Sequence, residues 1–66
     1  MKHTHIASTG HRLVVDDRAM RLTIVGQLDD AQQIPDAEIE AVCAAHGLVP
    51  TWLPCDADSL VLRRAH

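Results

Sequence analysis

The stretch PDAEIEAVCAAHGL, residues 35–48, decides the fold because it reads as one short helix between two pairs of strands. Pro35 suits the first turn of a helix, and the acidic residues after it meet the positive end of the helix dipole. Ile39 and Val42 recur at helical spacing. Gly47 is the residue expected to take the left-handed conformation that ends the helix. A helix over this stretch is therefore predicted.

Strands are predicted on both sides of the helix. Residues 11–16 and 20–28 alternate apolar and polar side chains, which is typical of half-buried strands. Residues 48–53 and 60–64 form a second pair, and Pro50 places its strand at an edge of the sheet. The predicted fold class is α+β: a four-stranded antiparallel sheet, β-β-α-β-β in strand order 1-2-4-3, with one helix packed on one face.

The 66 residues suffice for a single domain with a marginal core, because a chain this short buries only about 60% of its unfolded surface. Residues 11–66 are assigned to this domain, and the polar residues 1–10 to a flexible N-terminal arm or a loose first strand. The predicted core consists of inward-facing side chains: Leu13, Val15, Leu22, Ile24, Leu28, Ile39, Val42, Cys43, Trp52, Leu60 and Leu62.

A single helix leaves the other face of such a sheet uncovered. Exposed apolar patches of this kind often mark surfaces for a partner or for a second copy of the chain. Two alternatives stay open: the face binds a partner, or the N-terminal arm folds over it. The residues expected on this outer face are Val14, Thr23, Val25, Val49, Thr51, Leu53 and Val61.

Composition disfavours several classes of function. The net charge of −3 and the absence of Phe and Tyr argue against direct nucleic-acid binding, which uses basic faces and stacking side chains. No apolar run reaches the length of a membrane span, and no signal peptide is recognised. Two cysteines without a disulfide framework fit a reducing cytoplasm.

The nine acidic residues fall into four clusters, at positions 16–17, 29–30, 36–40 and 56–58. The predicted chain directions bring the last three clusters to one end of the sheet. Six of their seven carboxylates would then share a width of about 14 Å, given strands about 4.8 Å apart. This charge density lies between that of one DNA strand and that of the duplex. The candidate partner-binding residues are Asp29, Asp30, Asp36, Glu38, Asp56 and Asp58.

Three interpretations of these clusters compete. Aspartate is common in turns and helix starts, so each cluster also has a purely local explanation. As a joint surface, the clusters would mimic a nucleic acid and occupy a basic groove. The spacing of Asp56 and Asp58 is also found in calcium loops, but the later glycine and bidentate glutamate of such loops are missing. No metal and no cofactor are predicted.

The histidines and cysteines give no catalytic signature. His3 would face the same side as His5 if the arm is extended, and a histidine at position three can bind Cu(II) or Ni(II) with a free N-terminus. Cys43 lies near the C-terminal end of the predicted helix, where the dipole disfavours a thiolate, so core packing is expected. A disulfide with Cys55 is not expected, because the two residues fall at opposite ends of the predicted sheet. No enzyme activity is predicted.

In size and charge the chain resembles the small phage-encoded inhibitors, which include anti-CRISPR proteins and DNA mimics. This resemblance covers the whole chain and is carried by no motif. It implies a monomer that blocks the basic groove of a nucleic-acid-handling protein, such as a nuclease or a CRISPR effector subunit, without chemistry. The alternative function is a small homodimeric interaction module that uses the apolar outer face of its sheet.

Overall fold

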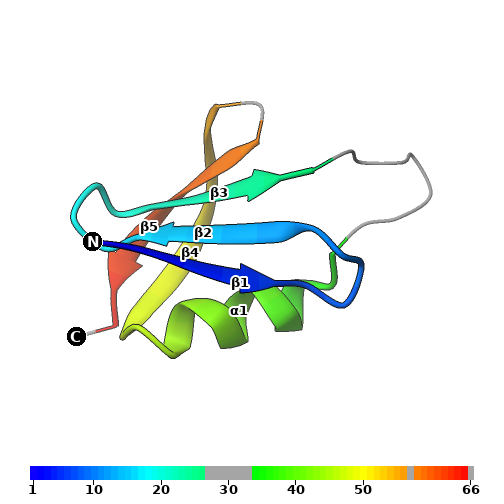
Figure 1. The fold of residues 1–66 in the computed structure, drawn as a ribbon. Helices are drawn as coiled ribbons and strands as arrows, with labels where there is room; N and C mark the ends of the chain where they lie inside the picture. Colours follow the sequence, from blue (N-terminus) through cyan, green and yellow to red (C-terminus); the bar gives the residue numbers. More distant parts are fainter. Residues whose placement is uncertain (27–33, 57, 66) are drawn as a thin grey trace.

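The computed structural model describes residues 1–26, 34–56 and 58–65, without the side chain of Asp56. One helix lies against one antiparallel sheet, so the α+β class is confirmed (Figure 1). The elements in chain order are β1 (Lys2–Ile6), β2 (Arg12–Asp16), β3 (Arg21–Val25), α1 (Asp36–Ala44), β4 (Leu48–Asp56) and β5 (Ser59–Arg64).

The sheet has five strands in the order β1-β2-β3-β5-β4, and every neighbouring pair is antiparallel. The prediction of four strands was therefore wrong, although β2 to β5 take the predicted order and β4 lies at an edge. The fifth strand is β1, formed by part of the segment assigned to an N-terminal arm. Its inward side chains, His3 and His5, are polar, so the segment shows no apolar alternation.

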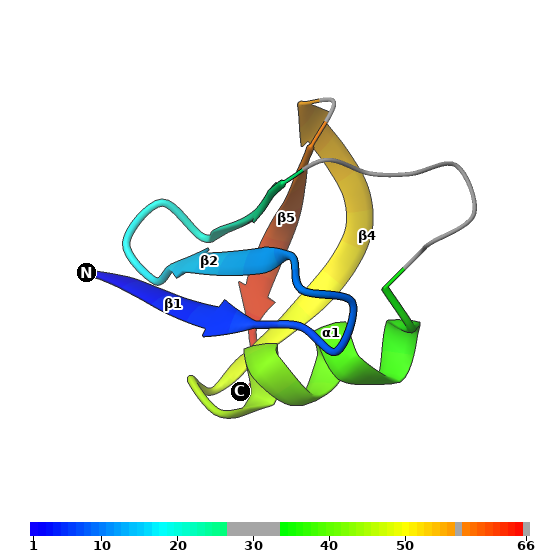
Figure 2. The same ribbon diagram turned by 45° about the vertical axis from the view of Figure 1, so that its right-hand side comes forward.

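Helix α1 lies across one face of the sheet and packs on β2 and β4 (Figures 1 and 2). The carbonyl oxygen of Pro35 accepts hydrogen bonds from the backbone N–H groups of Glu38 and Ile39, which starts the first turn. Gly47 follows the helix with φ of 70°, as predicted from its sequence position. Ile39 and Cys43 are the buried side chains of the helix.

The core lies between α1 and the sheet. Six predicted members are buried there, namely Leu13, Val15, Leu22, Ile39, Cys43 and Leu62. Three further predicted members are partly buried against them: Ile24, Val42 and Leu60. The predicted member Leu28 lies outside the described residues. The described core also includes Ala7, Ile34 and Leu48.

Trp52 was predicted to be in the core, and this was wrong, because its side chain is 41% exposed. The cause is an irregularity in β4. Pro50 pairs with Leu62 and Pro54 with Leu60, so β4 advances four residues while β5 advances two. The extra residues break the inward–outward alternation. Trp52 takes φ of 63° within this bulge.

Candidate functional site

The acidic residues at the start of α1 are held in two different ways. Asp36 is exposed, whereas Glu38 is half-buried and already bonded. The backbone N–H of Ser8 donates to Glu38 Oε1 at 2.6 Å, and the Ser8 hydroxyl donates to Glu38 Oε2 at 2.8 Å. Glu38 therefore fastens the turn between β1 and β2 to the helix. Asp29 and Asp30 lie outside the described residues.

The second group of predicted acids lies at the turn between β4 and β5. Asp58 is exposed, and its carbonyl oxygen accepts a hydrogen bond from the backbone N–H of Ile24, so this turn lies beside β3. Asp56 ends β4. The tip of the β4–β5 hairpin and the start of α1 lie well apart in both views (Figures 1 and 2). The described residues thus do not bring these two acidic groups together, and their role in partner binding stays a prediction.

The remaining acidic pair organises the turn between β2 and β3. Asp16 Oδ1 accepts hydrogen bonds from the backbone N–H groups of Arg18 and Ala19, at 3.1 and 3.0 Å. The bond from Ala19 is the main reason that the pKa of Asp16 is lowered. Asp17 accepts from the N-terminal amine at 2.7 Å and lies 3.1 Å from His3 Nε2. The bonds from the amine and then from His3 lower the pKa of Asp17 to about 2.

Three histidines meet beside Asp17. His5 Nε2 lies 2.8 Å from His46 Nε2, a hydrogen bond in which one ring donates and the other accepts. The rings of His3 and His46 are stacked, with centroids 4.1 Å apart. We call His3, His5, His46 and Asp17 the histidine cluster. Sequence reasoning missed it because 41 positions separate His5 from His46. Its one local signal was the alternation of His3 and His5.

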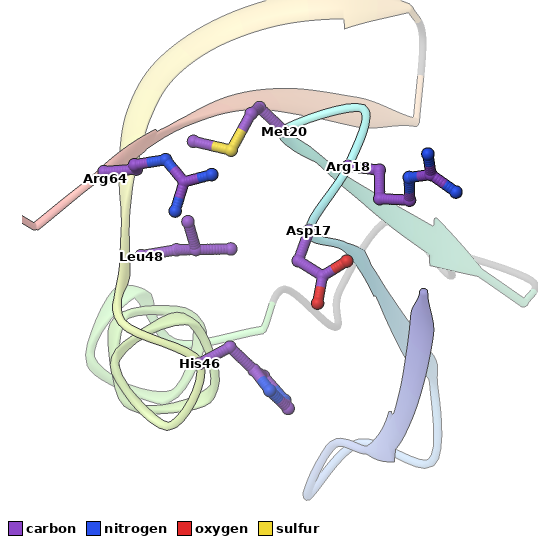
Figure 3. A pocket seen from close by; sticks show the side chains of 6 residues that line it. All are labelled: Asp17, Arg18, Met20, His46, Leu48 and Arg64. Carbon is purple, nitrogen blue, oxygen red and sulfur yellow. The ribbon is translucent and has the colours of Figure 1, made fainter.

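The histidine cluster forms part of the wall of a cavity of about 470 Å³ (Figure 3). In Figure 3 the side chain of Arg64 extends towards the middle of this cavity, whereas those of Arg18 and His46 extend away from it. The carboxylate that faces the cavity belongs to Asp17, which already contacts the N-terminal amine and His3. Met20 and Leu48 supply an apolar side.

The face of the sheet opposite α1 carries the outward side chains of five strands. Residues paired across antiparallel strands point to the same face, so the register defines this set. No described helix covers it (Figures 1 and 2). We call it the open face; its residues with described side chains are Lys2, Thr4, Ile6, Arg12, Val14, Asp16, Arg21, Thr23, Val25, Val49, Ser59, Val61 and Arg63.

The open face is basic although the chain as a whole is acidic. Its described side chains include four cations and one carboxylate, whereas the net charge of the chain is −3. Ile6 and Val25 are exposed among them, at 66% and 45%. A hollow of about 260 Å³ lies between the strands, with Val14 and Thr23 in its lining. The acidic helix α1, which has no basic residue in its last turn, lies on the opposite side.

The described residues contain little reactive chemistry. Burial raises the pKa of the Cys43 thiol, which disfavours the reactive thiolate, and Cys55 is an exposed free thiol. Within the described ranges no group of three or more His, Cys, Asp or Glu side chains is arranged to hold a metal ion. In the histidine cluster the polar atoms pair two by two instead of converging on one point. The N-terminal amine and His3 are both engaged by Asp17.

Comparison with known proteins gives no relative: no family model, curated protein or solved structure matches this chain. In the part of the chain that the structure describes, no helix is long and apolar enough to cross a bilayer.

Proposed function

We propose that this protein is a non-enzymatic binding module that presents the open face of its sheet to an acidic protein partner. The observation that carries this proposal is the charge of that face, four cations against one carboxylate among its described side chains, on a chain of net charge −3. Charged rims around an apolar centre steer encounters and fix the register of protein interfaces. The exposed Val25 and the half-buried Val14 provide the apolar centre.

The charge of the open face also decides between occupants. In a symmetric homodimer the same patch lies on both sides, so four cations of one copy would face four of the other. Like charges brought together across an interface are costly. A nucleic acid is disfavoured because the face carries no aromatic side chain for stacking. An acidic protein surface would attract the cations of the open face and would need no aromatic side chain for stacking.

A matched pair of charge reversals tests this function. Arg12→Glu changes the open face, and Arg18→Glu makes the same change in the exposed turn between β2 and β3. In pull-downs from host lysate at neutral pH, we expect Arg12→Glu to lose the captured protein and Arg18→Glu to keep it. The captured protein should be acidic, and raised salt should release it. Equal capture by both variants would contradict the open face as the binding surface.

A second candidate function is the blocking of a basic groove on a nucleic-acid-handling protein by acidic residues. It is favoured by α1, whose first turn holds Asp36 and Glu38 and whose last turn holds no basic residue. The resemblance to small phage-encoded inhibitors, including anti-CRISPR proteins, belongs to this candidate. Its partner-binding residues are Asp29, Asp30, Asp36, Glu38, Asp56 and Asp58. A cytoplasmic monomer is part of the same proposal.

Neutralising those six residues together, Asp→Asn and Glu→Gln, separates the two candidates. A groove blocker should lose its partner in this variant, and added DNA or RNA should displace the partner from the unmodified protein. Binding that survives neutralisation but is lost in Arg12→Glu supports the open face instead. Light scattering at micromolar concentration adds the third outcome, a homodimer, which both candidates exclude.

A further inference from the structure

The edge strand β1 has an unusual inward side. In β1 the side chains facing α1 are those of His3 and His5, which pair with Val15 and Leu13 on β2. No residue of β1 is buried or belongs to the hydrophobic core. Apart from the backbone ladder with β2, the strand is attached to the rest of the molecule by titratable groups.

These attachments all run to the histidine cluster. His5 bonds to His46 in the turn after α1, and His3 stacks on the same ring. At the start of the chain the N-terminal amine and His3 both contact Asp17, and Asp17 N–H donates to the carbonyl oxygen of Met1 at 3.3 Å. The strand Lys2–Ile6 is thus held to the turn after α1 through His46 and to the β2–β3 turn through Asp17. The turn that follows β1 has its own contact with α1, between Ser8 and Glu38.

The charges around His46 are mostly positive. Arg18 and Arg64 share the cavity wall with His46, and the N-terminal amine lies on the far side of Asp17. Asp17 is the carboxylate of the cluster itself, and Lys2 lies on the opposite side of β1. The C-terminal end of α1 favours a cation at its carbonyl groups, which partly offsets this crowding.

Protonation changes the cluster in a defined way. The bond between His5 and His46 needs one unprotonated nitrogen as acceptor, so two imidazolium rings cannot form it. Burial, and then the neighbouring His3 and His5, lower the pKa of His46 below its ordinary 6.5. A lowered histidine pKa means that the unfolded or undocked state binds the proton better. The stability it contributes is therefore present above about pH 6.5 and is lost as the pH falls below that value.

We propose that protonation of the histidine cluster releases β1 from α1 and so removes the part of the open face that β1 supplies. This inference rests on the proposed function, because it concerns the regulation of the same binding surface. Lys2, Thr4 and Ile6 leave the open face with the strand, and the edge of β2 becomes accessible. Mild acid thereby converts the five-stranded sheet into a four-stranded one, with order β2-β3-β5-β4.

Hydrogen–deuterium exchange of the free protein tests the switch without any partner. The readout is the protection of β1 amides relative to β3 amides, each corrected for its intrinsic exchange rate. Between about pH 7.5 and about pH 5, where imidazoles take up protons, we expect this ratio to fall about tenfold. An unchanged ratio over that range would overturn the switch and would leave partner binding at neutral pH untouched.

Variants assign the effect to the cluster. His46→Gln keeps a hydrogen-bonding group without a titratable charge, so its β1 protection should become nearly independent of pH. Thr4→Gln, on the opposite side of the same strand, is the control and should respond like the unmodified protein. If His46→Gln loses its circular dichroism signal, His5→Gln replaces it as the test variant. If β1 protection in folded His46→Gln or His5→Gln depended on pH as it does in the unmodified protein, the proposal would also be overturned.

Discussion

At the scale of single residues, two of the three glycines with positive φ differ in the space around them. Gly47 has φ of 70° and no atom lies within 4 Å of the position of an added Cβ. Gly26 has φ of 139°, and an added Cβ would lie 3.0 Å from His11 Cδ2. In Gly47→Ala the backbone strain acts alone, and we expect a loss of about 1 kcal/mol in the free energy of unfolding.

Gly26→Ala adds a close contact with the buried His11 ring to the backbone strain. The free energy of unfolding should therefore fall clearly more in Gly26→Ala than in Gly47→Ala. Urea unfolding of both variants measures the two free energies. Equal losses would mean that the His11 ring moves aside at no cost.

Asp17 predicts an acid dependence that differs from that of the histidines. Its pKa is lowered to about 2 from 3.8, first by the N-terminal amine and then by His3. A lowered carboxyl pKa stabilises the folded state above about pH 3.8, and this contribution is lost as the pH falls towards 2.

We therefore expect Asp17→Asn to have a lower urea midpoint than the unmodified protein at neutral pH. The two midpoints should approach each other as the pH approaches 2. A constant difference across this range would contradict the proposed role of the charge.

At the scale of elements, the contact between Ser8 and Glu38 ties the β1–β2 turn to α1. Two hydrogen bonds to one half-buried carboxylate, at 2.6 and 2.8 Å, should stabilise the fold by about 1 kcal/mol. Glu40 is exposed two positions along the same helix and serves as a matched control. Thermal or urea unfolding should show that Glu38→Ala is less stable than Glu40→Ala. Equal stability of the two variants would contradict a stabilising role of the contact between Ser8 and Glu38.

The elements also show which signals the sequence carries. Alternation in residues 11–16 and 20–28 predicted two strands, residues 48–53 and 60–64 predicted two more, and Pro35 and Gly47 marked the helix between them; these five elements occur in the predicted order. β1 was missed because its inward side chains are histidines. It therefore lacks the alternation of apolar and polar residues that marks a strand in a sequence. The histidine cluster depends on a contact over 41 positions, which no local pattern reveals.

At the scale of the whole molecule, the core is small and depends on few side chains. Leu22 is fully buried, so Leu22→Ala should cost about 2–5 kcal/mol in the free energy of unfolding. The total free energy of unfolding of a domain of this size is only about 5 kcal/mol or a little more, so this variant should be partly unfolded at room temperature.

Trp52 provides the contrast, because it is the largest side chain of the protein and its position was predicted wrongly. Its exposure of 41% means that Trp52→Ala removes little buried area, so the variant should stay folded. Circular dichroism and urea unfolding compare the two variants. A Trp52→Ala variant less stable than Leu22→Ala would contradict the location of the core.

The two edge strands of the sheet, β1 and β4, differ in their free backbone donors. Pro50 and Pro54 remove two backbone donors from β4, which makes that side a poor template for another chain. β1, or β2 once β1 has left, has no proline and keeps its donors. Backbone-mediated joining of copies can then occur at one side only. Growth into a fibril needs two competent sides, so such joining ends at a pair.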